Sequence, residues 1–150
     1  MFGFSIHSIA SPNRLVVTSP INLLMLLALG LITLWPLTIF LFKKPFPMGK
    51  VIGFSIFTVL VYGLIPSGAR LTLDKTSKTA TLTKYFFFHW TTETLDLASI
   101  REASLHTGST TSQIQIQLAD GSYRLLSELN QAGGKDQAVY EINQFLGVER

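Results

Sequence analysis

The chain has few side chains whose types and spacing could perform chemistry. Its three histidines are His7, His89 and His106, and none is spaced from another as paired metal ligands on a helix would be. The chain contains no cysteine, which excludes disulfides, thiol catalysis and cysteine-based metal or cluster sites. The residues therefore predict no metal site and no bound cofactor.

Groups suited to acid–base or nucleophilic catalysis are equally sparse. The nine acidic residues form no recognisable catalytic pair, and no serine or lysine lies in a nucleophile motif. Gly133-Gly134 reads as a loop ahead of a helix and not as a phosphate-binding loop. We predict that the protein is not an enzyme and has no catalytic residue.

The distribution of charge argues against nucleic acid as a partner. Residues 67–150 carry eight basic and nine acidic side chains, so the formal charge of +3 comes from the first part of the chain. A protein that binds nucleic acid concentrates positive charge on its binding face. We expect no nucleic-acid partner.

The aromatic run Tyr85–Trp90 is the most unusual local feature. If residues 79–90 form one long strand, alternation separates two faces. The face expected in the core carries Ala80, Leu82, Lys84, Phe86, Phe88 and Trp90. The other face begins with threonines and ends with Tyr85, Phe87 and His89, which we predict to be partner-binding residues, because aromatic side chains on a polar face are typical of contact patches. The alternative is that the helix or a neighbouring loop covers them.

Two long apolar runs, Ile21–Phe42 and Val51–Ile65, lie within a region of 66 residues that has no acidic side chain. Acid-free apolar runs with basic flanks are what a bilayer selects, and 22 residues of helix would extend about 33 Å, enough to cross it. We expect a two-helix transmembrane hairpin over residues 21–66, with a re-entrant second segment as the alternative. Trp35 and Pro36, where proline should kink the first helix, are further predicted partner-binding residues.

Alternating polar and apolar residues on both sides of this region indicate strands. Residues 1–20 could lie at the membrane interface or add an edge strand. After residue 66, strands are expected over 70–74, 79–90, 94–100, 101–106, 113–118 and 123–126, with turns at Lys75–Lys78 and Asp120-Gly121. Asp136 should cap a helix that continues to Leu146 and stops at Gly147.

This layout resembles the membrane-anchored bacterial proteins with a pleckstrin-homology-like (PH-like) domain. The similarity is carried by Leu73-Asp74, by Leu95-x-Leu97-x-x-Ile100, and by Leu118–Gly121 before a strand ending Leu125-Leu126-Ser127. It implies a membrane α-helical hairpin plus an α+β soluble domain over residues 67–150. The latter would be a PH-like β-barrel or sandwich of six or seven antiparallel strands capped by the C-terminal helix.

The resemblance also implies a function, because photosystem assembly factors of cyanobacteria and plastids share this order of elements. We expect a non-catalytic, membrane-anchored scaffold that binds integral membrane protein subunits, such as photosystem reaction-centre proteins, with the lipid bilayer as its other partner. It would reside in the thylakoid or cytoplasmic membrane, with the soluble domain on the cytoplasmic side. The alternative is a bacterial envelope PH-like protein that senses lipid, using Lys75, Lys78 and Lys84, or that oligomerises.

Overall fold

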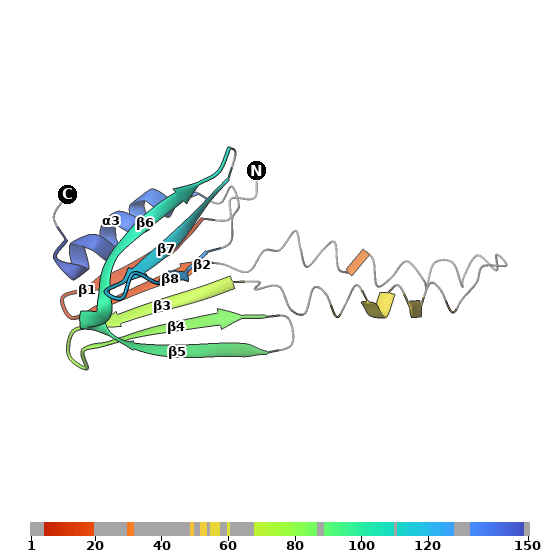
Figure 1. Cartoon of the computed structure of the whole chain (residues 1–150), viewed down its shortest axis with the longest axis horizontal. Coiled ribbons are helices and arrows are strands. Elements are labelled where there is room, and N and C mark those ends of the chain that lie inside the picture. Colours follow the sequence, from red (N-terminus) through yellow and green to blue (C-terminus); the bar gives the residue numbers. More distant parts are fainter. Residues whose placement is uncertain are drawn as a thin grey trace.

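A computed structural model gives the structure of the protein (Figure 1). It describes residues 5–19, 30–31, 49, 52–53, 55–57, 60, 68–86, 89–109, 111–127 and 133–148. Within these residues, eight strands form two antiparallel sheets, accompanied by a short 3-10 helix, η1 (Leu97–Ser99), and the helix α3 (Lys135–Leu146).

The larger sheet has five strands in the order β1-β2-β3-β4-β5, so neighbours in the chain are neighbours in space. These are β1 (His7–Ser11), β2 (Arg14–Ser19), β3 (Gly68–Asp74), β4 (Thr79–Tyr85) and β5 (Trp90–Asp96). The long connection over residues 20–67 leaves and re-enters at one end of the sheet, because Ser19 lies opposite Ala69 in the pairing of β2 with β3.

The smaller sheet has the order β6-β7-β8, formed by β6 (Ile100–Thr107), β7 (Ser112–Leu118) and β8 (Tyr123–Leu125). A β-bulge interrupts the pairing of β6 with β7 between Ile100 and Glu102. Helix α3 packs on β6 and β7 and also touches β1 and β2, which places it on the side of the molecule away from β5 (Figure 1).

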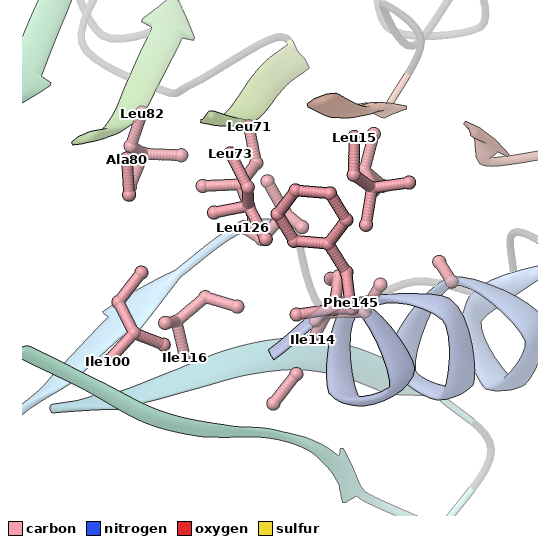
Figure 2. Close-up of a cluster of buried hydrophobic side chains, with 14 of the residues drawn as sticks. Leu15, Leu71, Leu73, Ala80, Leu82, Ile100, Ile114, Ile116, Leu126 and Phe145 are labelled. Carbon is pink, nitrogen blue, oxygen red and sulfur yellow. The ribbon is translucent and has the colours of Figure 1, made fainter. Parts of the chain in front are cut away.

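Strand alternation supplies the core between the two sheets. Apolar side chains at every second position of β2, β3, β4 and β7 are buried, and the residues between them, which are mostly polar, face outward. Figure 2 shows Leu71 and Leu82 of the larger sheet facing Ile100 and Ile116 of the smaller one, with Phe145 entering from α3. Burial of this apolar surface is the main force that holds the sheets together.

Helix α3 also protects the outer edge of β6. The side-chain amide of Asn143 donates to the carbonyl oxygen of Ala103 at 2.9 Å, and its oxygen accepts from the Ala103 N–H at 2.7 Å. The asparagine thus occupies the position of a neighbouring strand, so the edge is not available for pairing.

Several turns follow their sequence signals. Asp74 accepts hydrogen bonds from the backbone N–H groups of Thr76 and Ser77 in the β3–β4 turn, and these bonds lower the pKa of its carboxyl group. Gly121, with φ +83°, forms the β7–β8 turn. Gly147 ends α3 in the left-handed conformation, as expected. The helix begins one residue before Asp136 and its N-cap is Gly134, so the predicted capping role of Asp136 is wrong.

The predicted fold class is wrong. The described residues form mostly antiparallel β-structure of eight strands in two sheets, not a PH-like domain of six or seven strands joined to a membrane hairpin. One reason is that residues 7–19 supply two strands of the larger sheet. Another is that residues 79–90 do not form one strand, because the chain reverses between Phe86 and His89. The C-terminal helix of the prediction is present as α3.

No helix among the described residues is both long and apolar enough to cross a membrane. The hairpin predicted over residues 21–66 lies almost entirely outside the described residues; within it, helical residues are described only singly or in short groups, such as Leu31 and Ile52-Gly53. An apolar run marks a membrane span only where it forms about 20 continuous residues of helix. Within the described residues, this finding contradicts the predicted transmembrane helices and, with them, the predicted thylakoid or cytoplasmic membrane location.

Candidate functional site: an aromatic turn

The hairpin between β4 and β5 ends in a cluster of aromatic rings. The backbone N–H of Phe86 donates to the carbonyl oxygen of His89 at 2.8 Å, which closes the turn. The rings of Phe86 and His89 stack with their centroids 4.5 Å apart and their planes 1° from parallel. Tyr85 and Trp90 lie opposite each other as the last pair of the hairpin. We call Tyr85, Phe86, His89 and Trp90 the aromatic turn.

Strand alternation assigns these side chains to two faces of the larger sheet. The buried side chain of Leu82 defines the inner face, and Glu93 lies opposite it on β5. Side chains two residues apart on a strand lie on the same face. Phe86 and His89 therefore lie at the inner face with Leu82 and Glu93, and Tyr85 and Trp90 lie on the outer face. The aromatic turn therefore presents rings on both sides of the hairpin end.

Exposure of the aromatic turn differs from the sequence prediction. Trp90 was expected in the core, but 73% of its surface is exposed. Phe86, also expected in the core, is only half-buried, as is Tyr85, and His89 is exposed. The reversal at residues 86–89 explains the error, because it returns Trp90 alongside Tyr85 instead of extending the strand over the core.

Of the five predicted partner-binding residues, Tyr85 and His89 lie in the aromatic turn. Phe87, Trp35 and Pro36 lie outside the described residues. Sequence reasoning missed Trp90 as a surface residue. The signal that could have found it is weak, because Phe86–His89 contains no Gly, Pro, Asn or Asp to mark a turn.

The aromatic turn lies at the end of the sheet where residues 20–67 connect β2 to β3. Tyr85 pairs with Gly68, the first residue of β3, as well as with Trp90. The described residues of that connection also expose apolar side chains, between 49% and 71% of each: Leu31, Ile52, Ile56, Phe57 and Leu60. Exposed apolar surface is thus a feature both of this end of the sheet and of the connection that leaves from it.

The outer face of the larger sheet is otherwise rich in threonine. Cross-strand rows run through Thr18, Arg70, Thr83 and Thr92, and through Val16, Thr72, Thr81 and Thr94. The hydroxyl oxygens of Thr83 and Thr92 lie 3.4 Å apart. Such a face offers hydrogen-bonding groups beside the aromatic turn.

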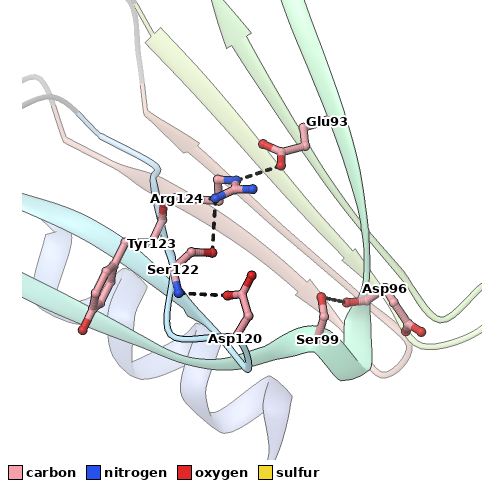
Figure 3. Close-up of polar contacts among 7 residues, drawn as sticks. All are labelled: Glu93, Asp96, Ser99, Asp120, Ser122, Tyr123 and Arg124. Atoms are coloured by element: carbon pink, nitrogen blue, oxygen red, sulfur yellow. Dashed lines mark hydrogen bonds and ion pairs between the residues drawn. The ribbon is translucent and has the colours of Figure 1, made fainter.

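An ion pair connects the two sheets beneath β5. Figure 3 shows the guanidinium of Arg124, on β8, donating to Glu93, on β5, over 2.7 Å. Arg124 also approaches the hydroxyl of Ser122, whose backbone N–H donates to Asp120. The side-chain and backbone contacts of Ser122 lower the pKa of Asp120. Because Arg124 and Glu93 are each partly exposed, the pair is worth about 0–1 kcal/mol and chiefly orients the two strands.

The described residues do not form a recognisable phosphate or metal site. Lys75 lies over the ring of Phe145, 4.5 Å from its centroid. Lys84 lies at the far end of β4 from the turn that holds Lys75 and Lys78, so the three lysines do not converge. No group of three His, Cys, Asp or Glu residues within the described ranges is placed to hold a metal ion.

A shallow groove of about 770 Å³ runs along α3. It is lined by Asp136, Val139, Tyr140, Asn143, Gln144, Gly147 and Val148. Tyr140 is 62% exposed and is the aromatic residue of this lining. After the aromatic turn, this groove is the second candidate binding surface among the described residues.

Comparison with protein-family models and with curated proteins finds no match for this chain. By their fold, the described residues form a two-sheet antiparallel β-structure with a C-terminal helix. Neither comparison supports the resemblance to photosystem assembly factors, which stays a prediction.

Proposed function

We propose that the protein is a non-catalytic binding module that contacts another protein through the aromatic turn. The observation that carries this proposal is the exposure of Trp90, at 73%, beside Tyr85 and the Phe86–His89 stack. Tyrosine and tryptophan are enriched at the energetic centres of protein interfaces, because they bury a large area and lose little side-chain entropy on binding. Exposed aromatic residues in such a cluster are most simply explained by a partner that covers them.

The aromatic turn is well positioned for this role. It ends a hairpin of seven consecutive residue pairs in regular register, and the 2.8 Å hydrogen bond from Phe86 to His89 closes it. A surface held in its binding conformation before contact pays less conformational entropy on association. The threonines beside it would supply hydrogen bonds at a polar rim.

The side chains of the aromatic turn also indicate what kind of partner surface would bind it. It carries no acidic or basic side chain other than His89, so recognition would depend on shape and apolar contact more than on charge. We expect a partner with an apolar patch large enough to cover Tyr85 and Trp90. Assembly of a photosystem is not part of this proposal, because it depended on the PH-like fold and membrane anchor that the structure does not support.

Co-purification tests the proposal directly. The full chain with an affinity tag after Arg150 is compared with the double variant Tyr85→Ser, Trp90→Ser, and bound proteins are quantified by mass spectrometry. A partner held by the aromatic turn should fall at least about ten-fold in the double variant, which corresponds to about 1.4 kcal/mol.

Tyr140→Ser provides the matched control, because Tyr140 is also a well-exposed aromatic residue but lies on α3. The proposal expects this variant to retain the partner. If the partner is kept by the double variant and lost with Tyr140→Ser, the groove along α3 is the binding surface and the proposal is wrong.

A further inference from the structure

We infer that β5 pairs with β5 of a second copy of this chain, so that two five-stranded sheets join edge to edge about a two-fold axis at Thr92. This inference is independent of the aromatic turn as a contact surface, because it depends on the backbone edge of β5. Three observations support it. They are the direction in which the peptide groups of β5 point, the features that limit pairing at the other sheet edges, and the register that the sequence of β5 favours.

Alternation in an antiparallel pair determines which peptide groups of β5 face outward. The N–H of Phe86 donates to His89, and the N–H of Leu97 donates to the carbonyl of Lys78, so odd-numbered residues of this strand pair with β4. The N–H and C=O groups of the even-numbered residues Trp90, Thr92 and Thr94 therefore point away from the sheet. In the part of the chain that the structure describes, no strand pairs with this edge.

Features that limit pairing are present at the edge of β6, in the short strand β8 and just before β1. Asn143 caps the edge of β6 at Ala103. Strand β8 is only three residues long. Beside β1, the N–H of Ile6 donates to the carbonyl of Gly133 at 3.0 Å, so the segment leading into the strand is bound to the segment leading into α3. Short strands and covered edges are the means by which proteins avoid unwanted pairing.

Strand β5 is neither short nor covered by another element among the described residues. It is seven residues long, it contains no lysine or proline, and its register with β4 is unbroken. The acidic residue within the strand body, Glu93, points inward. An inward-pointing charge can protect an edge, but Arg124 of the same chain pairs with Glu93 at 2.7 Å and offsets its charge. At the end of the strand, the carbonyl oxygen of Asp96 accepts a hydrogen bond from the hydroxyl of Ser99 at 2.7 Å (Figure 3). This carbonyl is therefore the outward group of β5 that is already occupied. A long, regular edge without a repelling charge is suited to accept another strand.

Among two-fold axes at Thr92, Glu93 and Thr94, the sequence of β5 favours the axis at Thr92. With the two-fold axis at Thr92, Trp90 lies opposite Thr94 of the second copy and Thr91 lies opposite Glu93. No like charges meet, and all three outward residues find partners. With the axis at Glu93, the two Glu93 carboxylates would face each other, which is destabilising. With the axis at Thr94, pairing would require the Asp96 carbonyl that Ser99 already occupies.

Self-complementarity is what favours a second copy over an unrelated peptide. One strand satisfies the edge of the other at Trp90, Thr92 and Thr94 simultaneously, and a two-fold contact is closed, so it does not propagate into fibres. The threonine row through Thr83 and Thr92 would continue across the axis into the second sheet. Threonine pairs directly opposite each other contribute favourably to sheets.

Disulfide trapping tests the register, because the chain has no cysteine of its own. At the two-fold axis, the Cα atoms of the two Thr92 residues would be about 5.5 Å apart, within the range of a disulfide. The full-length Thr92→Cys variant, oxidised with glutathione disulfide, should become predominantly a covalent dimer on a non-reducing gel.

Thr94→Cys and Thr81→Cys are the matched controls. The two Thr94 residues of the dimer would be offset by four residue positions, roughly 13 Å along the strands. Thr81 lies on β4, one strand further from the axis. Both should give at least ten-fold less covalent dimer than Thr92→Cys. Equal crosslinking at all three positions, or none at Thr92, would overturn the inference.

A charge exchange supplies a second readout. Thr92→Lys and Thr92→Glu each place like charges on the axis, so each alone should weaken self-association at least ten-fold in light scattering. A mixture of the two should restore dimers, since lysine then faces glutamate. Dimers that persist in either variant alone would place the interface elsewhere. Retention of a protein partner by these variants, with loss of the dimer, would separate this inference from the role of the aromatic turn.

Discussion

Lys135 is buried where the first turn of α3 meets the β6–β7 end of the smaller sheet. Only 2% of its surface is exposed, and its ammonium donates to the carbonyl oxygen of Ser112 and, at 3.4 Å, to the Ser112 hydroxyl. Desolvation lowers the pKa of Lys135 below its usual value of 10.5. The unfolded chain keeps this proton to higher pH than the folded chain does. The free energy of unfolding therefore rises as the pH increases through the interval between the two pKa values.

Lys135→Met should remove this dependence while preserving the volume of the side chain. We expect the stability of the variant relative to the parent to be greatest near neutral pH and to decline as the pH approaches about 10, because only the parent gains from losing the proton. Urea unfolding at several pH values measures the difference. A difference that stays constant across this range would show that the ammonium is not desolvated.

A substitution at Asn143 tests a second buried polar contact, the pair of hydrogen bonds to Ala103. Asn143→Leu removes both hydrogen bonds to Ala103 and leaves a backbone N–H and a C=O without them, which should cost about 1–3 kcal/mol for each group. The exposed neighbour Gln144 serves as the control, and Gln144→Leu should change the free energy of unfolding by less than about 0.5 kcal/mol. Similar effects of the two substitutions would mean that Asn143 does not secure β6.

At the scale of elements, the start of α3 depends on a close approach between two backbone segments. Gly134 has φ +79°, and a Cβ atom there would lie 2.9 Å from the carbonyl oxygen of Ile6. Gly134→Ala should therefore cost more than the roughly 1–2 kcal/mol of left-handed strain alone. At Gly133 a Cβ would meet nothing within 4 Å, so Gly133→Ala should be much milder in the same thermal melt. The prediction fails if the two alanine variants unfold alike.

Elements with strong local signals were predictable from the sequence. Residues 113–118 alternate without interruption and form β7, Asp120-Gly121 forms the following turn, and Gly147 ends α3. Asp74 and the residues after it form the β3–β4 turn because a carboxylate can accept the N–H groups that the turn leaves unpaired. In each case the information lies within a few consecutive residues.

Elements that depend on distant residues were not predictable. For residues 1–20 the sequence left an edge strand and an interfacial segment open. The choice depends on the pairing of β2 with β3, which follows the long connection over residues 20–67. The reversal at Phe86–His89 has no turn residue and is closed by a backbone hydrogen bond and a ring stack. Hydrophobic alternation continued through this run and predicted one strand, so the faces of His89 and Trp90 were assigned wrongly.

At the scale of the whole molecule, the two ends of the larger sheet have different characters. One end holds the β3–β4 turn and lies near α3, where Lys75 contacts Phe145. The other holds the aromatic turn beside Gly68, where the chain returns from the long connection. We therefore assign stability to the first end and to the core between the sheets, and contact with a partner to the second end.

The most direct measurement of this division is the free energy of unfolding of the full chain with Tyr85→Ser and Trp90→Ser together, compared with Leu71→Ala. Leu71 is buried in the core, and its truncation should cost about 2–5 kcal/mol. The aromatic pair should cost no more than about 1 kcal/mol, the value of a cross-strand contact, because Trp90 is largely exposed. A loss of stability equal to that of Leu71→Ala would show that the aromatic turn belongs to the core, and would contradict its role as a contact surface.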